Sequence, residues 1–404
     1  MTLLIIGAGL AGWTTAREFR KLDTSTPVVL ITADGGDFYA KPSLSNAYAQ
    51  KRTPEQLVST PAAKMAEMLN VTLMAHTLVQ SIDVAAHTVS SVQAGAQKTL
   101  TYGHLVLATG AQPIRVPVQG HAAARVQSIN SLEDFGVFYS SIKSPENPDE
   151  ISDGSSQNES KTVVIMGAGL IGCEFANDLL VAGHSVHVAD PSMRPLAALL
   201  PADAGNELAE ALANLGVVWH FGATVQAVDS SAGAEAARPL QVTLSDGSAI
   251  AADAVLSAVG LRADTRLAAD AGIICERGVV VNTLLQTSAA HVYALGDCAQ
   301  YASAGQRTLP YVMPIMNAAR ALAATLAGSP TVLVFPPMPV SIKTPALPIV
   351  VSAPHPAQAG GWLAAEDGVL GHWRFVDIEG VQRGFVLTGK HTARRMEQVK
   401  ATVL

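Results

Sequence analysis

The sequence is poor in cysteine and in charged residues. Its three cysteines, Cys173, Cys275 and Cys298, form no CxxC pair. So sparse and odd a set argues against a disulfide scaffold or a structural zinc site, and we expect no metal and a reducing compartment. Charged residues make up only 15% of the chain and the net charge is -7. This composition excludes a disordered chain, and an acidic protein has no general attraction for nucleic-acid phosphates.

Long apolar runs are also missing. No stretch is apolar for long enough to span a bilayer, so we expect no membrane insertion. The first residues lack the basic start and the cleavage site of a secretory leader, which favours a cytoplasmic protein. The 404 residues, 49% of them hydrophobic, suffice for two or three domains with cores of their own.

Two glycine-rich stretches of the same design follow apolar strands and open helical patterns: "IIGAGLAG" (5–12) and "MGAGLIG" (166–172). In the G-x-G-x-x-G motif, the first glycine makes a tight turn and the second lets the backbone approach a pyrophosphate. The third lets the helix pack on the strand. The helix N-terminus then faces the phosphates with its amides. The motif glycines are Gly7, Gly9, Gly12, Gly167, Gly169 and Gly172.

The residues that end the next strand of each repeat indicate which dinucleotide is bound. Asp190 ends "SVHVAD", where a carboxylate accepts both ribose hydroxyls of NAD and repels a 2′-phosphate. Arg194 lies nearby and argues for NADP, but the strand-end carboxylate carries more weight and favours NADH. The first repeat ends in Ala33 and Asp34, a poorer match. Two dinucleotide sites suggest FAD in the first and NADH in the second, with a hydride passing between them.

The repeated patterns predict an α/β fold with two Rossmann-like dinucleotide-binding domains and a smaller C-terminal α/β or mostly β domain. "HLVLATGAQP" closes the first repeat and "DAVLSAVGLRADT" the second. We expect a discontinuous FAD-binding domain at 1–113 and 265–328, an NAD-binding domain at 114–264, and a C-terminal domain at 329–404. The polar, acidic stretch 144–160 predicts a flexible surface loop.

Taken together, these strings resemble the FAD-dependent pyridine-nucleotide reductases, in which "GAGLAG", "ATG", "GAGLIGCE", "SAVGLR" and "YALGDCA" follow in this order. "YAKPSLSNA", "LPYVMPIMNAARALA" and "MPVSIKTPA" are similar to the rubredoxin reductases within that group. The resemblance covers nearly the whole chain, apart from the acidic stretch and the C-terminal end. It implies a glutathione-reductase-like fold and an enzyme that passes electrons from NADH through FAD, one at a time, to rubredoxin.

The resemblance assigns three residues to the placing and tuning of the flavin. Lys343 resembles the lysine at the flavin N1–C2 carbonyl, Lys41 a lysine beside the flavin, and Glu174 its acidic neighbour near the nicotinamide. A fixed cation near N1 stabilises the negative charge of a reduced flavin. Lys343 also lies among prolines and apolar residues, where a lysine is out of place unless an anionic group needs it. A snorkelling Lys343 and a structural Lys41–Glu174 ion pair are the alternatives.

The resemblance also implies contacts that bind the two coenzymes. Asp297 resembles the acid that hydrogen-bonds the ribityl chain of FAD. Val79 and Val312 resemble residues whose backbone meets the adenine and the pyrimidine end of the flavin. The expected FAD contacts are Gly7, Gly9, Leu10, Ala11, Gly12, Ala33, Asp34, Lys41, Val79, Thr109, Gly110, Glu174, Asp297, Val312 and Lys343. The expected NAD contacts are Gly167, Gly169, Gly172, Asp190 and Gly260.

A redox cysteine pair is missing after the first repeat, where disulfide reductases of this fold carry one and this chain reads "YAKPSLSNAYAQ". The flavin therefore has no thiol relay, and Cys173 and Cys298 are expected to be small packed residues. The pressure for a dimer is absent too, which is compatible with a monomer. An NADH oxidase or peroxidase needs a cysteine near the flavin and ranks low. A flavin-binding signalling protein would require slow NADH oxidation.

The expected partner is rubredoxin, a small acidic iron protein, which a net charge of -7 repels at long range. We therefore expect a local patch of basic residues near the flavin edge at which rubredoxin docks. Lys41, Arg320 and Lys343 are the candidates. A flavorubredoxin, or the ferredoxin of an oxygenase, is an alternative carrier. Alkane hydroxylation and oxygen detoxification are both open as the pathway served.

Overall fold

The computed structural model describes residues 1–143, 160–231, 238–364 and 371–403, which form two compact units. Unit 1 consists of Met1–Lys41, Val58–Gln112 and Leu261–Met338, and unit 2 of Pro42–Leu57, Pro113–Gly260 and Pro339–Leu404. The flexible loop expected at 144–160 lies, except for its last residue, outside the described residues. In the part of the chain that is described, no helix has the length and apolar character needed to cross a membrane.

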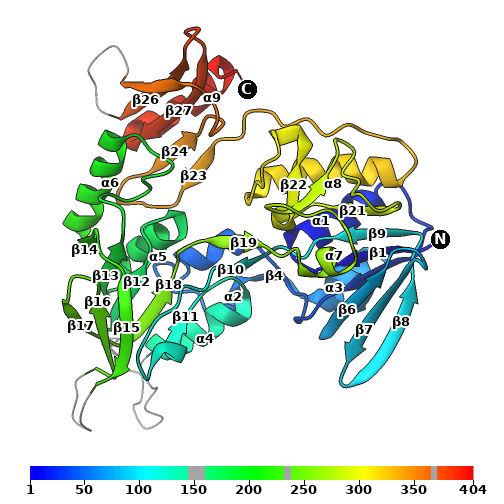
Figure 1. Ribbon diagram of the computed structural model, residues 1–404, viewed down its shortest axis with the longest axis horizontal. Helices are drawn as coiled ribbons and strands as arrows, with labels where there is room; N and C mark the ends of the chain where they lie inside the picture. Colours follow the sequence, from blue (N-terminus) through cyan, green and yellow to red (C-terminus); the bar gives the residue numbers. More distant parts are fainter. Residues whose placement is uncertain (144–159, 232–237, 365–370, 404) are drawn as a thin grey trace. The chain divides into compact units, whose positions relative to one another are not determined.

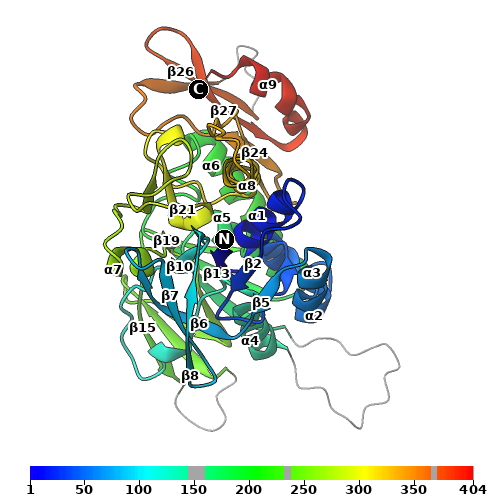
Figure 2. The same ribbon diagram turned by 90° about the vertical axis from the view of Figure 1, so that its right-hand side faces the viewer.

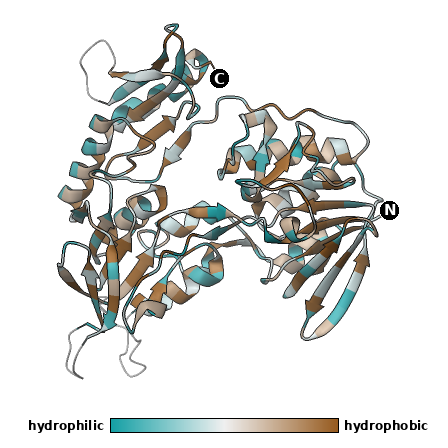
Figure 3. Cartoon of the chain, in the orientation of Figure 1, coloured by the Kyte–Doolittle hydropathy of each residue, from teal (hydrophilic) through white to brown (hydrophobic). Residues whose placement is uncertain are grey.

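Unit 1 is built on a five-stranded parallel sheet. The strand order is β21 (Val292–Ala294), β9 (His104–Leu107), β1 (Leu3–Ile6), β2 (Val28–Ile31) and β5 (Thr72–Met74). All four residues of β1 are buried, because a central parallel strand is covered on both faces. The sheet strands are accordingly hydrophobic runs (Figure 3). This sheet carries the first glycine-rich turn at the end of β1.

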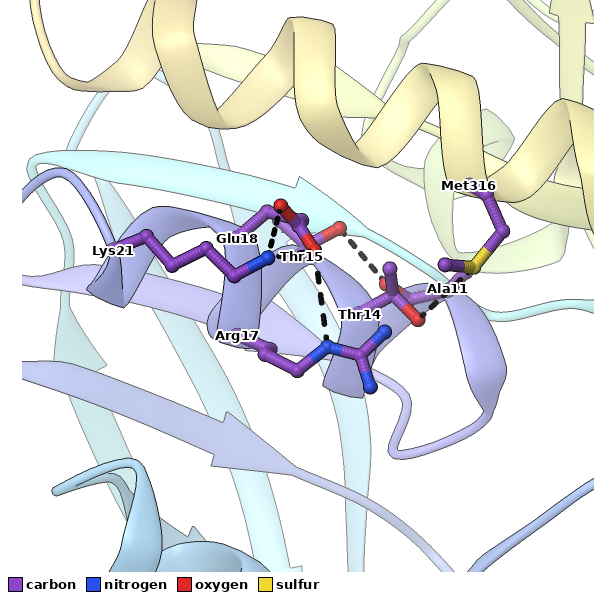
Figure 4. A network of polar contacts seen from close by, with 7 residues as sticks. All are labelled: Ala11, Thr14, Thr15, Arg17, Glu18, Lys21 and Met316. Carbon is purple, nitrogen blue, oxygen red and sulfur yellow. Dashed lines mark hydrogen bonds and ion pairs between the residues drawn. The ribbon is translucent and has the colours of Figure 1, made fainter.

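Helices α1 (Leu10–Arg20) and α8 (Val312–Leu326) pack against each other in unit 1 (Figure 1). Thr14 Oγ1 of α1 lies 3.9 Å from the sulfur of Met316 in α8 (Figure 4). The buried Thr15 hydroxyl donates to the Ala11 carbonyl at 2.8 Å, so it needs no partner outside its helix. On the same helix Lys21 pairs with Glu18 at 2.7 Å. These contacts fix the helix that opens at the first turn.

Smaller elements complete unit 1. An antiparallel sheet is formed by β6 (Thr77–Asp83), β7 (Thr88–Gln93) and β8 (Ala96–Thr101). Strand pairs are formed by β20 (Val279–Val281) with β22 (Ala299–Tyr301), and by β3 (Phe38–Tyr39) with β4 (Val58–Thr60). Two short helices are α3 (Ala62–Met68) and α7 (Arg266–Asp270). Strand β10 (Ala111–Pro113) pairs with β19 (Leu261–Ala263), where the chain passes between the units and returns.

Unit 2 repeats the plan with a second five-stranded parallel sheet. The strand order is β11 (Val126–Gln127), β18 (Ala254–Ser257), β12 (Thr162–Met166), β13 (Ser185–Asp190) and β14 (Val218–Phe221). An antiparallel sheet follows, made of β15 (Val225–Ser230), β16 (Leu240–Leu244) and β17 (Ala249–Ala252). The helices are α2 (Pro54–Leu57), α4 (Leu132–Ile142), α5 (Leu170–Val181) and α6 (Ala202–Leu215). Helix α5 opens at the second glycine-rich turn.

The C-terminal part of unit 2 is a five-stranded antiparallel sheet. The strand order is β23 (Val340–Ile342), β24 (Ile349–Ser352), β27 (Gln382–Thr388), β26 (His372–Asp377) and β25 (Gly360–Ala364). Helix α9 (Arg395–Ala401) lies beside β27 (Figure 2). Its Val399 packs against Val350, Phe385 and Leu387. The expected α/β fold, with two Rossmann-like sheets and a smaller C-terminal domain, is confirmed.

Candidate coenzyme sites

The first glycine-rich turn has the shape that a phosphate needs. Gly7 has φ +107°, and a Cβ there would lie 2.2 Å from the Ala108 carbonyl oxygen. A Cβ on Gly12 would lie 1.9 Å from the Gly7 oxygen, whereas a Cβ on Gly9 would meet nothing within 4 Å. The first amides of α1 lack intrahelical acceptors, and in this described helix no side chain of the cap bonds them. The turn therefore offers amides beside open space.

The second turn repeats this geometry glycine for glycine. Gly167 has φ +101°, and a Cβ there would lie 2.8 Å from the Ala258 oxygen. A Cβ on Gly172 would lie 2.0 Å from the Gly167 oxygen, while Gly169 again faces space with nothing within 4 Å. Gly169 is the N-cap of α5, and its carbonyl accepts the first helical bond from Cys173 N at 3.0 Å. Both turns thus fit the pyrophosphate of a dinucleotide.

Asp190 ends β13 beside the second turn, as the sequence predicted. Its Oδ2 accepts the amide of Ala168 at 2.7 Å, and its Oδ1 accepts the amide of Ser192 at 2.7 Å. Ala168 lies between Gly167 and Gly169, so Asp190 helps to hold the turn. A carboxylate has about four acceptor sites, and two are used here. The remaining capacity fits the two ribose hydroxyls of NAD.

Unit 1 offers acceptors of its own around the first turn. Asp34 Oδ1 accepts from Thr32 Oγ1 at 2.5 Å and from Gly36 N at 3.0 Å. Asp297 follows β21, and within the described residues its carboxylate accepts no hydrogen bond. Burial raises the pKa of Asp297, while the charge of Lys41 lowers it. A half-buried carboxylate without a hydrogen-bond donor fits a polyol chain such as the ribityl of FAD.

Other expected contacts lie where the main chain is irregular or incompletely bonded. Val79 is buried in β6, where the pairing register with β7 shifts just after it. Val312 is the first residue of α8, so its amide has no intrahelical acceptor. Thr109 Oγ1 donates to the Asp264 carbonyl at 2.9 Å. This bond joins the residues just before β10 to the residue that follows β19. Gly260 has φ +114° and accepts from Ile114 N at 3.0 Å.

The expected residues divide between the two units. Unit 1 holds Gly7, Gly9, Leu10, Ala11, Gly12, Ala33, Asp34, Lys41, Val79, Thr109, Gly110, Asp297, Val312 and Arg320. Unit 2 holds Gly167, Gly169, Gly172, Glu174, Asp190, Gly260 and Lys343. All expected NAD contacts therefore lie in unit 2, and most expected FAD contacts lie in unit 1.

Glu174 and Lys343 form a partly buried ion pair in unit 2. The Lys343 ammonium contacts Glu174 Oε2, and the Lys343 amide donates to Glu174 Oε1 at 2.9 Å. Ser45 joins them, because its hydroxyl accepts from Lys343 Nζ at 2.7 Å and donates to Glu174 Oε2 at 2.6 Å. The Glu174 side chain is 6% exposed and that of Lys343 27%. Lys343 is thus a cation partner of Glu174 within unit 2, and the expected pairing of Glu174 with Lys41 stays a prediction.

Two further polar residues of α5 were not among the expected site residues. Asn177 Oδ1 accepts the amide of Ala346 at 3.0 Å. Asp178 accepts the amides of Tyr48 at 2.9 Å and Ala49 at 2.8 Å. Burial raises the pKa of Asp178 to about 6 despite these two bonds. The bonds to Asp178 explain why residues 42–57, which the sequence placed in the first domain, group with unit 2. Polar residues in an apolar helix were the available signal.

Cys173 and Cys298 are buried packing residues, as expected. Both are fully buried, and their thiols contact main-chain carbonyls, Cys173 at Ala168 (3.4 Å) and Cys298 at Leu295 (3.3 Å). Burial raises the pKa of Cys298 to about 11 and that of Cys173 still further. Burial also raises the pKa of the partly buried Cys275. A thiolate is therefore disfavoured at all three positions.

Residues 1–323 of the sequence match the pyridine nucleotide-disulphide oxidoreductase family. The chain belongs to this family. Residues 332–402 of this oxidoreductase match the rubredoxin binding C-terminal domain. The resemblance to rubredoxin reductases is confirmed. Membership of the family implies binding of FAD and NAD(H).

Named relatives of this oxidoreductase span its whole length. It is 40% identical over 395 residues to the rubredoxin-NAD(+) reductase of Alcanivorax borkumensis, covering 98% of this chain and 97% of that one. It is 36% identical over 389 residues to the nitric oxide reductase FlRd-NAD(+) reductase of Aeromonas salmonicida, covering 96% and 92%. Among solved structures, a covalent putidaredoxin reductase–putidaredoxin complex shares the fold with a TM-score of 0.84, at 22% identity, covering 99% and 93%.

Proposed function

We propose that this oxidoreductase passes electrons from NADH through FAD to a rubredoxin. The observation that carries the choice of partner is the match of residues 332–402 to the rubredoxin binding C-terminal domain. The rubredoxin-NAD(+) reductase of A. borkumensis, similar over nearly the full length, supports the same partner. Two turns of one geometry, one in each unit, support two dinucleotides.

The residues of the chain bind and orient the coenzymes. In this proposal the amides at the start of α1 bind the FAD pyrophosphate, and the amides at the start of α5 bind the pyrophosphate of NADH. The Asp297 carboxylate accepts a hydrogen bond from a hydroxyl of the ribityl chain of FAD. Asp190 accepts ribose hydroxyls. Lys343, held by Glu174, supplies a positive charge at the flavin. Bound FAD supplies the chemistry, since it accepts a hydride and releases electrons one at a time.

The proposal also covers the domain boundaries, the compartment and the oligomeric state. The FAD-binding domain would comprise 1–113 and 265–328, the NAD-binding domain 114–264, and the C-terminal domain 329–404. Three cysteines without a disulfide support a cytoplasmic protein. A monomer is proposed because no cysteine pair has to be completed by a second subunit.

The test is turnover of the purified FAD-loaded protein with NADH and one acceptor at a time. Rubredoxin, an oxygenase-type ferredoxin, oxygen and hydrogen peroxide are compared at equal concentration. Rapid reduction of rubredoxin with slow turnover of the others is the expected result. Rapid peroxide turnover would overturn the proposal.

A flavorubredoxin is the second candidate partner. The observation that favours it is the 36% identity to the FlRd-NAD(+) reductase of A. salmonicida over 96% of this chain. Adding a flavorubredoxin to the same comparison separates the two carriers. The oxidase and peroxidase alternatives lose support, because a sulfenate forms from a thiolate and burial raises the pKa of all three thiols.

A further inference from the structure

Helix α5 carries a stripe of three buried polar side chains. Glu174, Asn177 and Asp178 are 5%, 1% and 2% exposed, and the spacings of three and four residues put them on one face of the helix. Buried polar groups are costly unless they are hydrogen-bonded. We call these three residues the α5 polar stripe.

Every member of the α5 polar stripe accepts hydrogen bonds from a distant segment of unit 2. Glu174 and Asp178 bond Ser45, Tyr48 and Ala49 in the segment 45–49. Glu174 and Asn177 bond the amides of Lys343 and Ala346 in the segment 343–346. The helix that opens at the second glycine-rich turn therefore holds both segments at once.

The same bonds fix the ammonium of Lys343. Its main-chain amide is held by Glu174 Oε1, which sets where the side chain begins. Its Nζ is held by Glu174 Oε2 and by the Ser45 hydroxyl, which sets where the side chain ends. An ammonium has three donors, so within the described residues one remains for a ligand. Ser45 in turn lies in the segment that Asp178 anchors through Tyr48 and Ala49.

We propose that Ser45, Asn177 and Asp178 are positioning residues for the charge of Lys343. This inference rests on the proposed function, in which Lys343 acts on the flavin. Ser45 orients the ammonium directly, while Asn177 and Asp178 hold the two segments that bring Lys343 and Ser45 to Glu174. The field of a fixed charge at a reaction centre costs no reorganisation when the electrons arrive. A displaced ammonium would stabilise reduced flavin less and lower its midpoint potential.

The experiment compares Ser45→Ala, Asp178→Asn and Lys343→Met in the FAD-loaded protein. Ser43→Ala is the control, because Ser43 lies in the same short helix (Lys41–Asn46) but is partly exposed, whereas Ser45 is buried. Two readouts are measured: the flavin midpoint potential, and hydrogen exchange of the amides of Tyr48, Ala49 and Ala346. We expect Lys343→Met to lower the potential most, Ser45→Ala and Asp178→Asn to lower it in part, and Ser43→Ala to leave it unchanged.

Hydrogen exchange separates positioning from folding. Asp178→Asn should speed exchange at Tyr48 and Ala49 about tenfold, the effect of losing about 1.4 kcal/mol, while Ser45→Ala should leave these amides protected. A lowered potential in Ser45→Ala with normal exchange supports direct positioning. If Lys343→Met lowers the potential but Ser45→Ala and Asp178→Asn do not, the inference is wrong while the proposed function stands. If Lys343→Met has no effect, the role of Lys343 in the proposed function fails, and the inference with it.

Discussion

At the scale of single residues, the partner of Glu174 decides how its removal will act. The carboxylate neutralises Lys343 and also accepts the Ser45 hydroxyl and the Lys343 amide. Removing one partner of a buried pair leaves the other charge uncompensated. Lys343 is 27% exposed, so water screens part of that cost. Function should therefore suffer more than folding.

We expect Glu174→Gln to slow the reduction of bound flavin by NADH about tenfold, the effect of about 1.4 kcal/mol in the barrier. Glutamine keeps the shape of the side chain but no longer neutralises or fixes the ammonium. Stopped-flow bleaching of the flavin absorbance measures the rate, and thermal unfolding measures stability. Glu210→Gln, on the exposed side of α6, is the control. An unchanged rate with Glu174→Gln would remove Glu174 from the reaction.

Asp178 predicts a pH dependence of stability. Burial raises its pKa from 3.8 to about 6, although the amides of Ala49 and Tyr48 and the charge of Lys343 lower it, and Glu174 raises it again. The folded protein then binds a proton more tightly than the unfolded chain does. The free energy of unfolding contributed by Asp178 is therefore largest below pH 4 and is lost as pH rises to about 6. Two pKa units correspond to about 3 kcal/mol.

Asp178→Asn should remove this contribution. Urea unfolding at closely spaced pH values between 4 and 7 gives the free energy of unfolding as a function of pH. The slope of this curve is compared between the variant and the parent. We expect the parent to lose more stability than Asp178→Asn over this range. Asp203→Asn, exposed in the first turn of α6, controls for the loss of a carboxylate. Equal slopes in parent and Asp178→Asn would contradict the raised pKa.

At the scale of elements, each glycine-rich turn contains one glycine that faces open space and two that the fold needs. Gly9 and Gly169 have φ of -71° and -77°, which alanine adopts without strain, and an added Cβ meets nothing. Gly12 and Gly172 have no room, because a Cβ there would lie 1.9 and 2.0 Å from a carbonyl oxygen, far inside van der Waals contact. The same substitution should thus have opposite consequences at the two positions.

We expect Gly169→Ala to weaken NADH binding about tenfold or more, with FAD content and thermal stability unchanged. Gly9→Ala should instead lower FAD content, because its Cβ occupies the space open to the other pyrophosphate. Gly172→Ala should destabilise the protein itself. Flavin absorbance per protein and NADH titration in thermal unfolding report the three effects. Loss of FAD with Gly169→Ala would reverse the assignment of the two turns.

The turns and Glu174 were predictable from sequence, but the long-range hydrogen bonds of the α5 polar stripe were not, for a physical reason. A glycine-rich turn is specified by residues within one strand–turn–helix, so Gly7 and Gly167 and their neighbours could be identified locally. The bond between Lys343 and Ser45 joins residues 298 positions apart, and that between Tyr48 and Asp178 spans 130. Nothing local to either partner specifies the other. The sequence "EFANDLL" did carry a signal, since three polar residues interrupt an apolar helix at helical spacing.

At the scale of the whole molecule, the net negative charge of the protein repels an acidic partner at long range. The net charge is -7, and rubredoxin is expected to be acidic. Arg320 lies exposed on α8 beside a hollow lined also by Asn317, Thr331 and Val334. An exposed cation at such a place can raise the association rate with an acidic protein, and salt screens that effect.

We expect Arg320→Glu to lower kcat/KM for rubredoxin about three- to tenfold at low salt, with little change in flavin reduction by NADH. Raising the ionic strength should lower kcat/KM for rubredoxin in the parent protein. The difference in kcat/KM between the parent and Arg320→Glu should then become smaller. Arg266→Glu, exposed on α7 in the same unit, is matched in charge. Equal losses in both variants would indicate a general effect of net charge rather than docking at Arg320.

The α5 polar stripe also limits how this protein can be engineered. One graft design exchanges only the Rossmann repeat that contains α5 for that of a homologue. Here such a chimera would separate α5 from Tyr48 and Ala346, and would leave the buried Asn177 and Asp178 without their donors. A working chimera must therefore carry three separate pieces of sequence together: residues 42–57, the Rossmann repeat, and the start of the C-terminal domain.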